Sequence, residues 1–405
     1  MGKPKIRFKG YEKEWEQRKL GELVKFSKGT GYSKGDLKEF GTPIILYGRL
    51  YTNYETVIKD VDTFVDAKNG SVYSCGGEVI IPASGETAED ISVASVVGKS
   101  GILLGGDLNI ITPPSEIDSA FLALSISNGK PHNEMAKMAQ GKSIVHLHNS
   151  DLEKIELAYP SYEEQVQIST YFGYLDHLIT LHQREIDRIV CLRKAMVEKM
   201  FPQNGADVPA VRFSRYKEPW RLCQFSEIFT ERHIIDTISD EYPQLAFTIE
   251  EGVIRPEDKK TNKRDFLIID KATKKYLQTE YDDIIYNPAN VIYGAIHRNA
   301  LGKGCVSPIY KIFYTDQDST FMECIVRHPN FIKEISRSME GTVKKLRTLK
   351  PKAFLEMSAY IAPTIEEQRQ IGEYFRQMDR LIEIEKEELE KIKHIKSACL
   401  EKMFV

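Results

Sequence analysis

The chain has 405 residues, which at ~150 residues per domain predicts two or three folded units. Hydrophobic residues make up 41% and charged residues 28%, a globular composition that excludes an intrinsically disordered chain. The formal net charge of −3 excludes a uniformly basic nucleic-acid binder. Any contact with DNA must therefore come from local patches, and the second half of the chain carries the more positive balance.

The residues at the amino terminus are positively charged, but no apolar stretch follows them and no window approaches the ~20 apolar residues of a membrane span. We therefore expect a cytoplasmic protein that makes no membrane contact. The six cysteines lie far apart, with no C-x-x-C pair and no histidine at metal-binding spacing. Neither a disulfide framework nor a metal site is predicted.

The first half begins with Ile6-Arg7-Phe8, Tyr11 and Trp15 and continues in glycine-punctuated runs such as Glu78-Val79-Ile80-Ile81, which are typical of short buried strands. Polar and basic residues close to glycines, with aromatic neighbours, are candidates for DNA contact, although tyrosines belong to a core more often than to a contact surface. The candidates in this half are Lys28, Thr30, Tyr47, Arg49, Lys142, Ser143 and His146.

The run Ala136–Ser143 satisfies a permissive phosphate-loop pattern. Its first glycine is replaced by Ala136 and the preceding residues have a helical pattern, whereas a phosphate loop needs a glycine-rich turn that leaves a strand. The second half has Gly341-Thr342-Val343-Lys344-Lys345 at the corresponding place. Both segments are therefore predicted to be basic loops that begin near a glycine.

From Glu164 to Phe201, apolar residues recur at alternating steps of four and three, the pattern of a coiled-coil seam. The predicted seam is Ile168, Phe172, Leu175, Ile179, Ile186, Ile189 and Met196, and the end of the chain repeats it as Ile371, Phe375, Met378, Ile382, Leu389, Ile392 and Cys399. Polar residues interrupt both seams at matching places, His182 and Arg193 in the first, Glu385 and Lys396 in the second, and such positions usually set the register.

An isolated amphipathic helix usually packs only on its own domain. A helix of about 37 residues is about 55 Å long, more than one small domain can cover. The natural partner of each long helix is the other one, and because one lies between the halves and the other at the end of the chain, we expect an intramolecular antiparallel pair.

The second half restarts with Val211-Arg212-Phe213, Tyr216 and Trp220, and contains a predicted buried strand at Asp283-Ile284-Ile285-Tyr286. Its basic runs can neutralise phosphates, and a His-Arg-Asn triplet can contact base edges, although a solvated charged face remains an open alternative for each run. The candidates are Lys259, Lys260, Lys263, Arg264, His297, Arg298, Asn299, Lys344, Lys345 and Arg347.

Catalytic motifs are missing from the pattern. The segment Asn287-Pro288-Ala289-Asn290 matches the first two residues of the Asn-Pro-Pro-aromatic loop of adenine methyltransferases, but its last two differ. No trustworthy glycine-rich cofactor loop, paired-carboxylate metal site or Ser-His-Asp arrangement can be located. We therefore predict no catalytic residue, no metal and no bound cofactor in this chain.

The two halves repeat one another most closely at their ends. The segment with Pro160, Glu163-Glu164-Gln165, Gln167-Ile168, Tyr171-Phe172, Asp176 and Leu178-Ile179 has its counterpart in Pro363, Glu366-Glu367-Gln368, Gln370-Ile371, Tyr374-Phe375, Asp379 and Leu381-Ile382, and both copies end in Glu-Lys-Met-Phe. Constant ends around divergent middles indicate one scaffold that presents two different recognition surfaces.

The predicted fold class is α+β, with two similar mixed α/β domains separated by a long antiparallel two-helix coiled coil and related by a pseudo-two-fold internal repeat. The expected boundaries are residues 1–160 for the first domain, 161–203 for the central helix, 204–362 for the second domain and 363–405 for the terminal helix.

The Pro-x-x-Glu-Glu-Gln-x-Gln-Ile start of each long helix and the Trp-x-x-x-x-x-x-Glu-Leu/Ile start of each half resemble type I restriction-modification specificity subunits, over essentially all of residues 6–405. The resemblance implies two target recognition domains, each reading one half of a split site in double-stranded DNA. It also implies two methyltransferase subunits docked on the helices, which bring S-adenosylmethionine and methylate adenine. A restriction and translocase subunit using ATP and Mg would join for cleavage.

Two other functions stay open at this point. A stand-alone DNA methyltransferase or nuclease would need its own cofactor or metal loop, so a chain that does not bind S-adenosylmethionine would count against it. A coiled-coil scaffold without DNA would explain the helices but not the basic loops. Filter binding across a salt series separates these functions, because phosphate contacts give a steep salt dependence.

Overall fold

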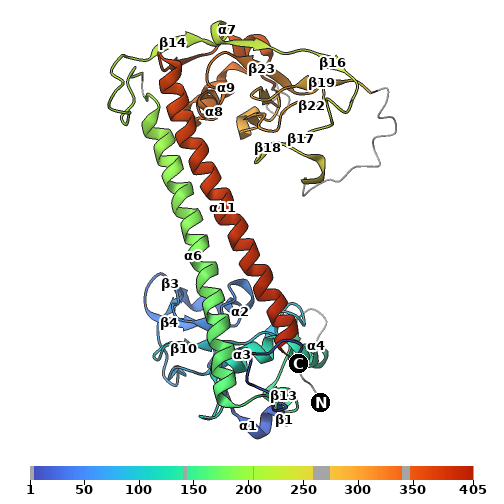
Figure 1. Ribbon diagram of the computed structural model, residues 1–405. Coiled ribbons are helices and arrows are strands. Elements are labelled where there is room, and N and C mark those ends of the chain that lie inside the picture. The colour runs from blue at the N-terminus through green and yellow to red at the C-terminus, as the bar shows by residue number, and fades with distance from the viewer. Residues whose placement is uncertain (1–3, 140–143, 204, 259–273, 340–346, 405) are drawn as a thin grey trace. The chain divides into compact units, whose positions relative to one another are not determined.

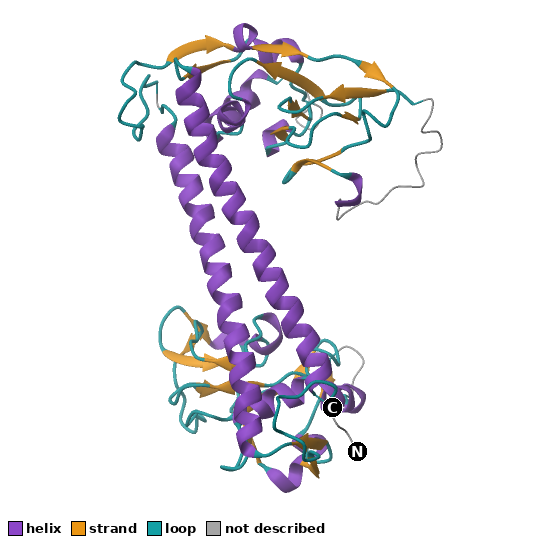
Figure 2. Cartoon of the chain, in the orientation of Figure 1, coloured by secondary structure: helices purple, strands orange, loops and turns teal. Residues whose placement is uncertain are grey.

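The computed structural model describes residues 4–139, 144–203, 205–258, 274–339 and 347–404. The chain forms two compact units, Met1–Gln183 with Glu387–Val405, and Arg184–Lys386. Each unit combines short strands with helices (Figure 2). Within the described ranges, no helix is both long and apolar enough to cross a membrane.

The first unit contains short strands and helices followed by part of each long helix (Figure 1). Its elements are β1 (Glu16–Lys19), α1 (Leu20–Leu23), β2 (Lys25–Lys28), η1 (Lys34–Asp36), β3 (Leu37–Lys38), β4 (Thr42–Ile45), α2 (Arg49–Thr52), β5 (Val57–Ile58), β6 (Phe64–Val65), β7 (Val79–Pro82), β8 (Ser84–Gly85), β9 (Ser95–Val97), β10 (Leu103–Leu104), β11 (Leu108–Thr112), α3 (Ser119–Ser127), α4 (Gly129–Met138), β12 (Val145–His146), α5 (Asn149–Leu152), β13 (Glu156–Tyr159), the start of α6 (Tyr162–Met200) and the end of α11 (Ile365–Met403).

The second unit follows the same plan. Its elements are the end of α6, β14 (Arg221–Gln224), α7 (Phe225–Ile228), β15 (Phe229–Glu231), β16 (Ile235–Asp236), β17 (Ala246–Thr248), β18 (Gly252–Ile254), η2 (Pro256–Asp258), β19 (Tyr276–Thr279), β20 (Ile284–Tyr286), η4 (Val291–Tyr293), β21 (Ile296–Arg298), β22 (Gly304–Val306), β23 (Lys311–Thr315), α8 (Ser319–Val326), α9 (Pro329–Ser338), α10 (Pro351–Leu355), β24 (Ser358–Ile361) and the start of α11.

The internal repeat extends into the central sheet of each unit. The order β2-β11-β7-β9 in the first unit matches β15-β23-β20-β21 in the second, and the pair β1-β13 matches β14-β24. Strands β7 and β20 are completely buried, which confirms the two buried strands predicted at Glu78–Ile81 and Asp283–Tyr286. The divergent middles of the sequence thus share a core sheet.

The units differ in the strands inserted around that sheet. The first unit adds the sheet β10-β4-β6-β3, whereas the second adds β16-β19-β22 and the hairpin β17-β18. Since the core sheet is common to both, the inserted strands and the loops at the sheet ends are what distinguish one domain from the other.

A buried ion pair fastens each domain to the start of its long helix. The guanidinium of Arg7 donates from Nε to Glu164 Oε1 (2.6 Å) and from a terminal nitrogen to Oε2 (2.7 Å). Arg212 binds Glu367 in the same two-pronged way, at 2.6 and 2.8 Å. The Glu164 and Glu367 side chains are 1% and 0% exposed, so the arginine is needed to neutralise each of them.

The glutamine that follows each of these glutamates ties the helix to the rest of its domain. Gln165 accepts a hydrogen bond from the backbone N–H of Asp118 (3.0 Å), and Gln368 accepts one from Asp318 (3.1 Å). Each amide nitrogen donates back to the carbonyl at the end of the preceding strand, Pro160 in one case and Ala362 in the other, at 2.9 Å. The repeated Glu-Glu-Gln motif therefore has a structural role at the helix start.

The two long helices pack on each other within each unit. In the first unit, Ile168 and Phe172 of α6 share a cluster with Met403 of α11. In the second, Phe375 and Ile382 of α11 share a cluster with residues at the end of α6. Because the start of one helix meets the end of the other, the pair is antiparallel, which confirms the predicted coiled coil. Every predicted seam residue is buried or half-buried.

Polar seam residues form ion pairs between the two helices, one in each unit. Lys396 of α11 binds Asp176 of α6, and Arg193 of α6 binds Asp379 of α11 through two bonds of 2.6 and 3.0 Å. The two pairs occupy equivalent positions of the repeat with the helix roles exchanged. A one-residue shift of either helix would separate the charges, so these pairs fix the register.

We predict that Arg212→Ala lowers the free energy of unfolding of the protein by about 3 kcal/mol or more, because it leaves the Glu367 carboxylate buried without a counter-charge. Thermal or urea unfolding measures the loss. Arg215→Ala is the matched control, since Arg215 is exposed and hydrogen bonds to Gln370 on the surface; it should cost less than about 1 kcal/mol. Equal losses in the two variants would contradict this role of the buried pair.

Candidate nucleic-acid interface

Several predicted DNA-contacting residues lie outside the residues that the structure describes. They are Lys142, Ser143, Lys259, Lys260, Lys263, Arg264, Lys344 and Lys345. The other candidates can be located on the elements that hold them.

In the first unit, Lys28 lies exposed at the end of β2 and makes no ion pair with any described residue. Thr30 accepts a hydrogen bond from the backbone of Val72 (3.2 Å), and Tyr47 packs against a hydrophobic cluster. Arg49 is 13% exposed and binds Glu55 (2.5 Å), so its charge is neutralised inside the domain. Of these four residues, Lys28 is the best placed to meet a phosphate.

His146 lies exposed on β12, which pairs with β8 immediately after the central strand β7. Its ring is parallel to that of His148, with centroids 6.5 Å apart. Between them, the backbone N–H of Leu147 donates to Ala83 O (3.0 Å). This bond anchors the end of the first predicted basic loop at the carboxyl end of β7.

In the second unit, His297 is 3% exposed and its Nε2 lies 2.8 Å from Ile249 O. Gly252, with φ +71°, lies so close to the ring that a Cβ would stand 2.5 Å from the His297 Cγ. Burial, with a smaller contribution from the charge of Arg327, lowers the pKa of His297 to about 4. A neutral, enclosed imidazole of this kind cannot contact a base edge, so the expected base contact is corrected for His297.

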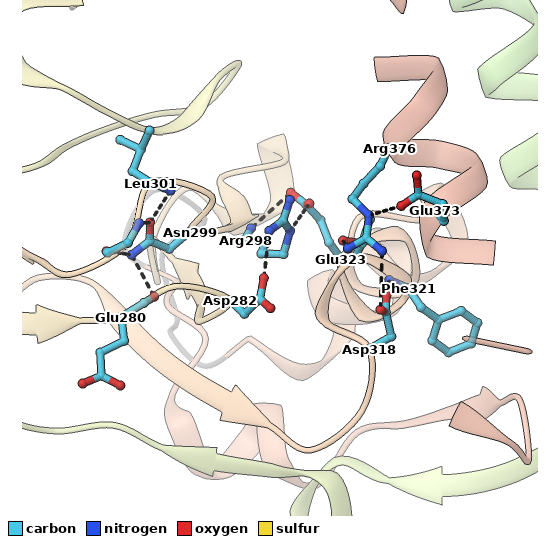
Figure 3. Close-up of polar contacts among 12 residues, drawn as sticks. Glu280, Asp282, Arg298, Asn299, Leu301, Asp318, Phe321, Glu323, Glu373 and Arg376 are labelled. Carbon is cyan, nitrogen blue, oxygen red and sulfur yellow. Dashed lines mark hydrogen bonds and ion pairs between the residues drawn. The ribbon is translucent and has the colours of Figure 1, made fainter. Parts of the chain in front are cut away.

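Asn299 is completely buried and joins two turns (Figure 3). Its amide nitrogen donates to Glu280 O (2.9 Å) and Gly302 O (2.7 Å), while its carbonyl oxygen accepts from the backbone N–H of Leu301 (3.0 Å). These bonds use the groups that would have to face a base, so the expected base contact is corrected for Asn299 as well.

Arg298, between these two residues, is 10% exposed and held by carboxylates (Figure 3). It donates to Asp282 Oδ1 (2.8 Å), and its Nε lies 3.6 Å from Glu323 Oε2. Its positive charge is therefore compensated within the domain, which argues against the phosphate or base contact expected of it.

Arg298 lies opposite Ile284 at the start of β20, whereas the residues that follow the second predicted basic loop are anchored just after the end of this strand. The backbone N–H of Leu349 donates to Pro288 O (3.0 Å), and the Tyr286 hydroxyl donates to Leu349 O (3.2 Å). Arg347 is exposed just before this anchor. The bond is the counterpart of the one between Leu147 and Ala83 in the first unit, so in each unit the described residues that follow the predicted basic loop are anchored at the carboxyl end of the central strand.

The helix pair carries exposed apolar residues that the sequence analysis missed. The first helix patch is Leu178 (40% exposed), Leu181 (44%) and Ile395 (48%), all in the first unit; the second helix patch is Leu381 (50%), Ile384 (44%) and Leu192 (47%), all in the second. The patches occupy matching positions of the repeat, and each of their residues directly precedes a seam position in the sequence. The repeated apolar character at these positions was the available signal in the sequence.

A cleft of about 860 Å³ in the first unit is lined by acidic side chains. It lies around the start of α6, and its acidic residues are Glu12, Glu14, Glu16, Glu22, Glu116, Glu163 and Glu164. Arg7, Lys13 and Arg18 also line the cleft, and Arg7 neutralises Glu164. The carboxylates outnumber these cations, so the remaining negative charge repels phosphate and this face does not suit DNA. Within the described part of the chain, no three or more His, Cys, Asp and Glu side chains are grouped in a way that could hold a metal ion.

A duplicated α/β domain, each copy of which packs on part of the same two long helices, defines a class of modular proteins with one constant frame and two variable surfaces. Residues 12–190 match the family described as "Type I restriction modification DNA specificity domain". Two relatives from Methanocaldococcus jannaschii, the type I restriction enzyme MjaVIII specificity subunit and the putative MjaX specificity subunit, are each 22% identical. The matches cover 96% of this chain and 91% and 92% of those proteins.

The fold is shared with solved structures. The S subunit of a type I restriction-modification system from M. genitalium superposes with a TM-score of 0.63 at 16% identity, covering 99% of both chains. A chain from a structure described as the basis of "complex assembly and conformational transition of the type I R-M system" has a TM-score of 0.52 at 15% identity, covering 97% of this chain and 98% of that one. Over nearly its whole length the chain is thus similar to type I restriction-modification specificity subunits, a class of non-catalytic DNA-recognition subunits, and residues 12–190 match the specificity domain of that family.

We predict that stability falls between pH 6.5 and pH 4 partly through His297. Its folded pKa of about 4 lies below the ordinary 6.5, so the unfolded chain binds the proton more readily and stability is lost as the pH falls through this window. The contribution is on the order of 3 kcal/mol. Between pH 7 and pH 4.5 the melting temperature of the His297→Gln variant should fall less than that of the wild type. Burial also lowers the pKa of His328, but this residue is the same in both proteins and does not contribute to the difference. Parallel pH profiles would contradict this assignment.

Proposed function

We propose that the chain recognises a bipartite site in double-stranded DNA, with each domain reading one half, and docks two methyltransferase subunits on its helix pair. The observation that carries this proposal is the combination of a common core sheet with different inserted strands in the two units. One frame holds two recognition surfaces, which is what a target with two unlike halves requires.

The DNA contacts that we propose lie at the carboxyl ends of β7 and β20. Lys28, His146 and Arg347 are the described candidates with exposed side chains. The lysines of the two basic loops, Lys142 in one and Lys344 and Lys345 in the other, are proposed from the sequence to neutralise phosphates. Phosphate contacts position the protein, and base contacts by neighbouring residues provide the specificity.

Catalysis would be supplied by the partner subunits. The methyltransferases would bind S-adenosylmethionine and methylate adenine, and a restriction and translocase subunit would use ATP and Mg. Expression of this chain with its neighbouring methyltransferase gene, followed by genome-wide mapping of methylated adenines, tests the proposal. A motif of two short half-sites around an unread spacer is expected, and a contiguous motif would overturn it.

Exchanging residues 6–160 for the equivalent domain of another specificity subunit should change one half of the methylated motif and leave the other half unchanged. The reason is that each central sheet, with its inserted strands, is closed within its own unit. Methylome mapping of the chimera measures the outcome. If both halves changed, the two domains would not read independently.

The helix patches are the proposed docking sites for the methyltransferase subunits. Each patch leaves three large aliphatic side chains 40–50% exposed on a helix pair that already has a closed seam. Such a face fits an amphipathic helix of a partner. Because the patches are equivalent in the repeat, each should bind one copy of the same partner, which gives two copies per chain.

We predict that Leu381→Glu with Ile384→Glu removes one of the two methyltransferase subunits, since two carboxylates in this patch cannot be buried under a partner helix. The mass of the co-purified complex measures the loss. The equivalent variant of the first helix patch, Leu178→Glu with Leu181→Glu, should give the same stoichiometry, and all four changes together should leave the chain alone. Retention of two copies in either double variant would exclude these patches.

A further inference from the structure

The central strand β20 of the second unit has an exposed tyrosine near each end. Tyr281 precedes the strand and is 58% exposed, while Tyr293 follows it and is 69% exposed. Exposed aromatic side chains on a DNA-binding domain can contact bases by stacking or by apolar contact with a thymine methyl group. The surroundings of the two residues decide which of them faces DNA.

The end of β20 at Tyr281 is dominated by acids. Its described cations are all engaged: Arg298 with Asp282 and Glu323, Arg232 with Glu280 and Asp283, and Lys303 with Glu241. Asp282 itself adopts φ +74°, which directs its carboxylate to the arginine. Phosphates approaching this end would meet carboxylates without free cations, so it does not face DNA.

The end of β20 at Tyr293 has the opposite character. Lys311 lies opposite Tyr286 in the ladder and forms no ion pair with any residue in the described ranges. Helix α9 packs on η4, and the backbone N–H of Leu349 donates a hydrogen bond to Pro288 O (3.0 Å). Residues on both sides of 340–346, which lie outside the described ranges, thus contact the region 287–293.

The turn is closed by its own hydrogen bonds and has side-chain polar groups without a partner among the described residues. Asn287 Oδ1 accepts hydrogen bonds from the backbone N–H groups of Ala289 (3.0 Å) and Asn290 (3.3 Å), and Gly294, with φ +88°, ends η4. The side-chain nitrogen of Asn287 and the whole side-chain amide of Asn290 make no hydrogen bond to a described residue. An asparagine with free amide groups can bind an adenine edge.

We propose that the turn 287–293 contacts DNA and that Tyr293 packs against the bases of the half-site read by the second domain. The inference rests on the proposed DNA-reading function and assigns a contact residue within it. The hydrogen bonds of the turn fix the backbone that carries this exposed ring, so little backbone entropy has to be lost on binding. Tyr281, at the acidic end of the same strand, makes no such contact.

The test uses the complex of the full chain with its co-expressed methyltransferase subunits and a duplex carrying the methylated motif of the wild type. Tyr293→Ala should weaken binding to this duplex about tenfold, the usual cost of losing one base contact, and Tyr293→Glu about a hundredfold because a carboxylate would meet the phosphates. The matched controls Tyr281→Ala and Tyr281→Glu should stay within about twofold of the wild type. Fluorescence anisotropy gives the affinities, and melting curves confirm that the exposed substitutions leave the fold intact.

A scrambled duplex completes the design. Tyr293→Ala should leave its weak binding unchanged, since that binding depends on phosphates alone. If Tyr293→Ala matches the wild type on the methylated motif, or if Tyr281→Ala loses as much, the inference is overturned and the proposed function stands. If the wild-type complex itself does not distinguish the motif from the scrambled duplex, the proposed function fails, and the assignment of Tyr293 fails with it.

Discussion

The rest of the structure depends on one ion pair that occurs twice, Arg7 with Glu164 and Arg212 with Glu367. Each glutamate is buried in the first turn of a long helix, where an uncompensated carboxylate would be very costly. The two-pronged arginine removes that cost and fixes the angle at which the domain meets the helix. Because this ion pair fixes the orientation of each domain to its own helix, the inserted strands of the domain can vary without changing that orientation.

The separation of a constant frame from variable insertions follows from where burial is required. Strands β7 and β20 are buried on both faces, so their sequences are restricted to apolar residues in both units. The sheet β10-β4-β6-β3 and the hairpin β17-β18 lie outside this common core. Their sequences are free to follow the DNA half-site, and this freedom explains why the middles of the two halves look unrelated although their central sheets have the same strand order.

The sequence was sufficient for the features that depend on periodicity and repetition. The seam positions, the antiparallel pairing and the two buried strands were all predicted, because burial of an apolar stripe requires a regular spacing. The structural roles of His297 and Asn299 could not be predicted from the sequence, because only the fold brings their partners to them. These partners are Ile249 for His297, and Glu280 and Gly302 for Asn299. A short polar triplet looks the same in a sequence whether its side chains face solvent or close two turns.

The charge distribution explains how an acidic chain can bind DNA. Several described arginines of the second domain compensate carboxylates of their own domain, as Arg298 and Arg232 do, and therefore add little to an outward field. The number of cations in such a domain is therefore a poor guide to DNA binding, and the positions of the uncompensated cations decide how a phosphate backbone approaches. At 0.15 M salt the field of an exposed charge reaches only about 8 Å, so carboxylates further away than this do not cancel a local group of cations. The net charge of −3 is thus compatible with the DNA contacts that we propose at the carboxyl end of the central strand in each unit.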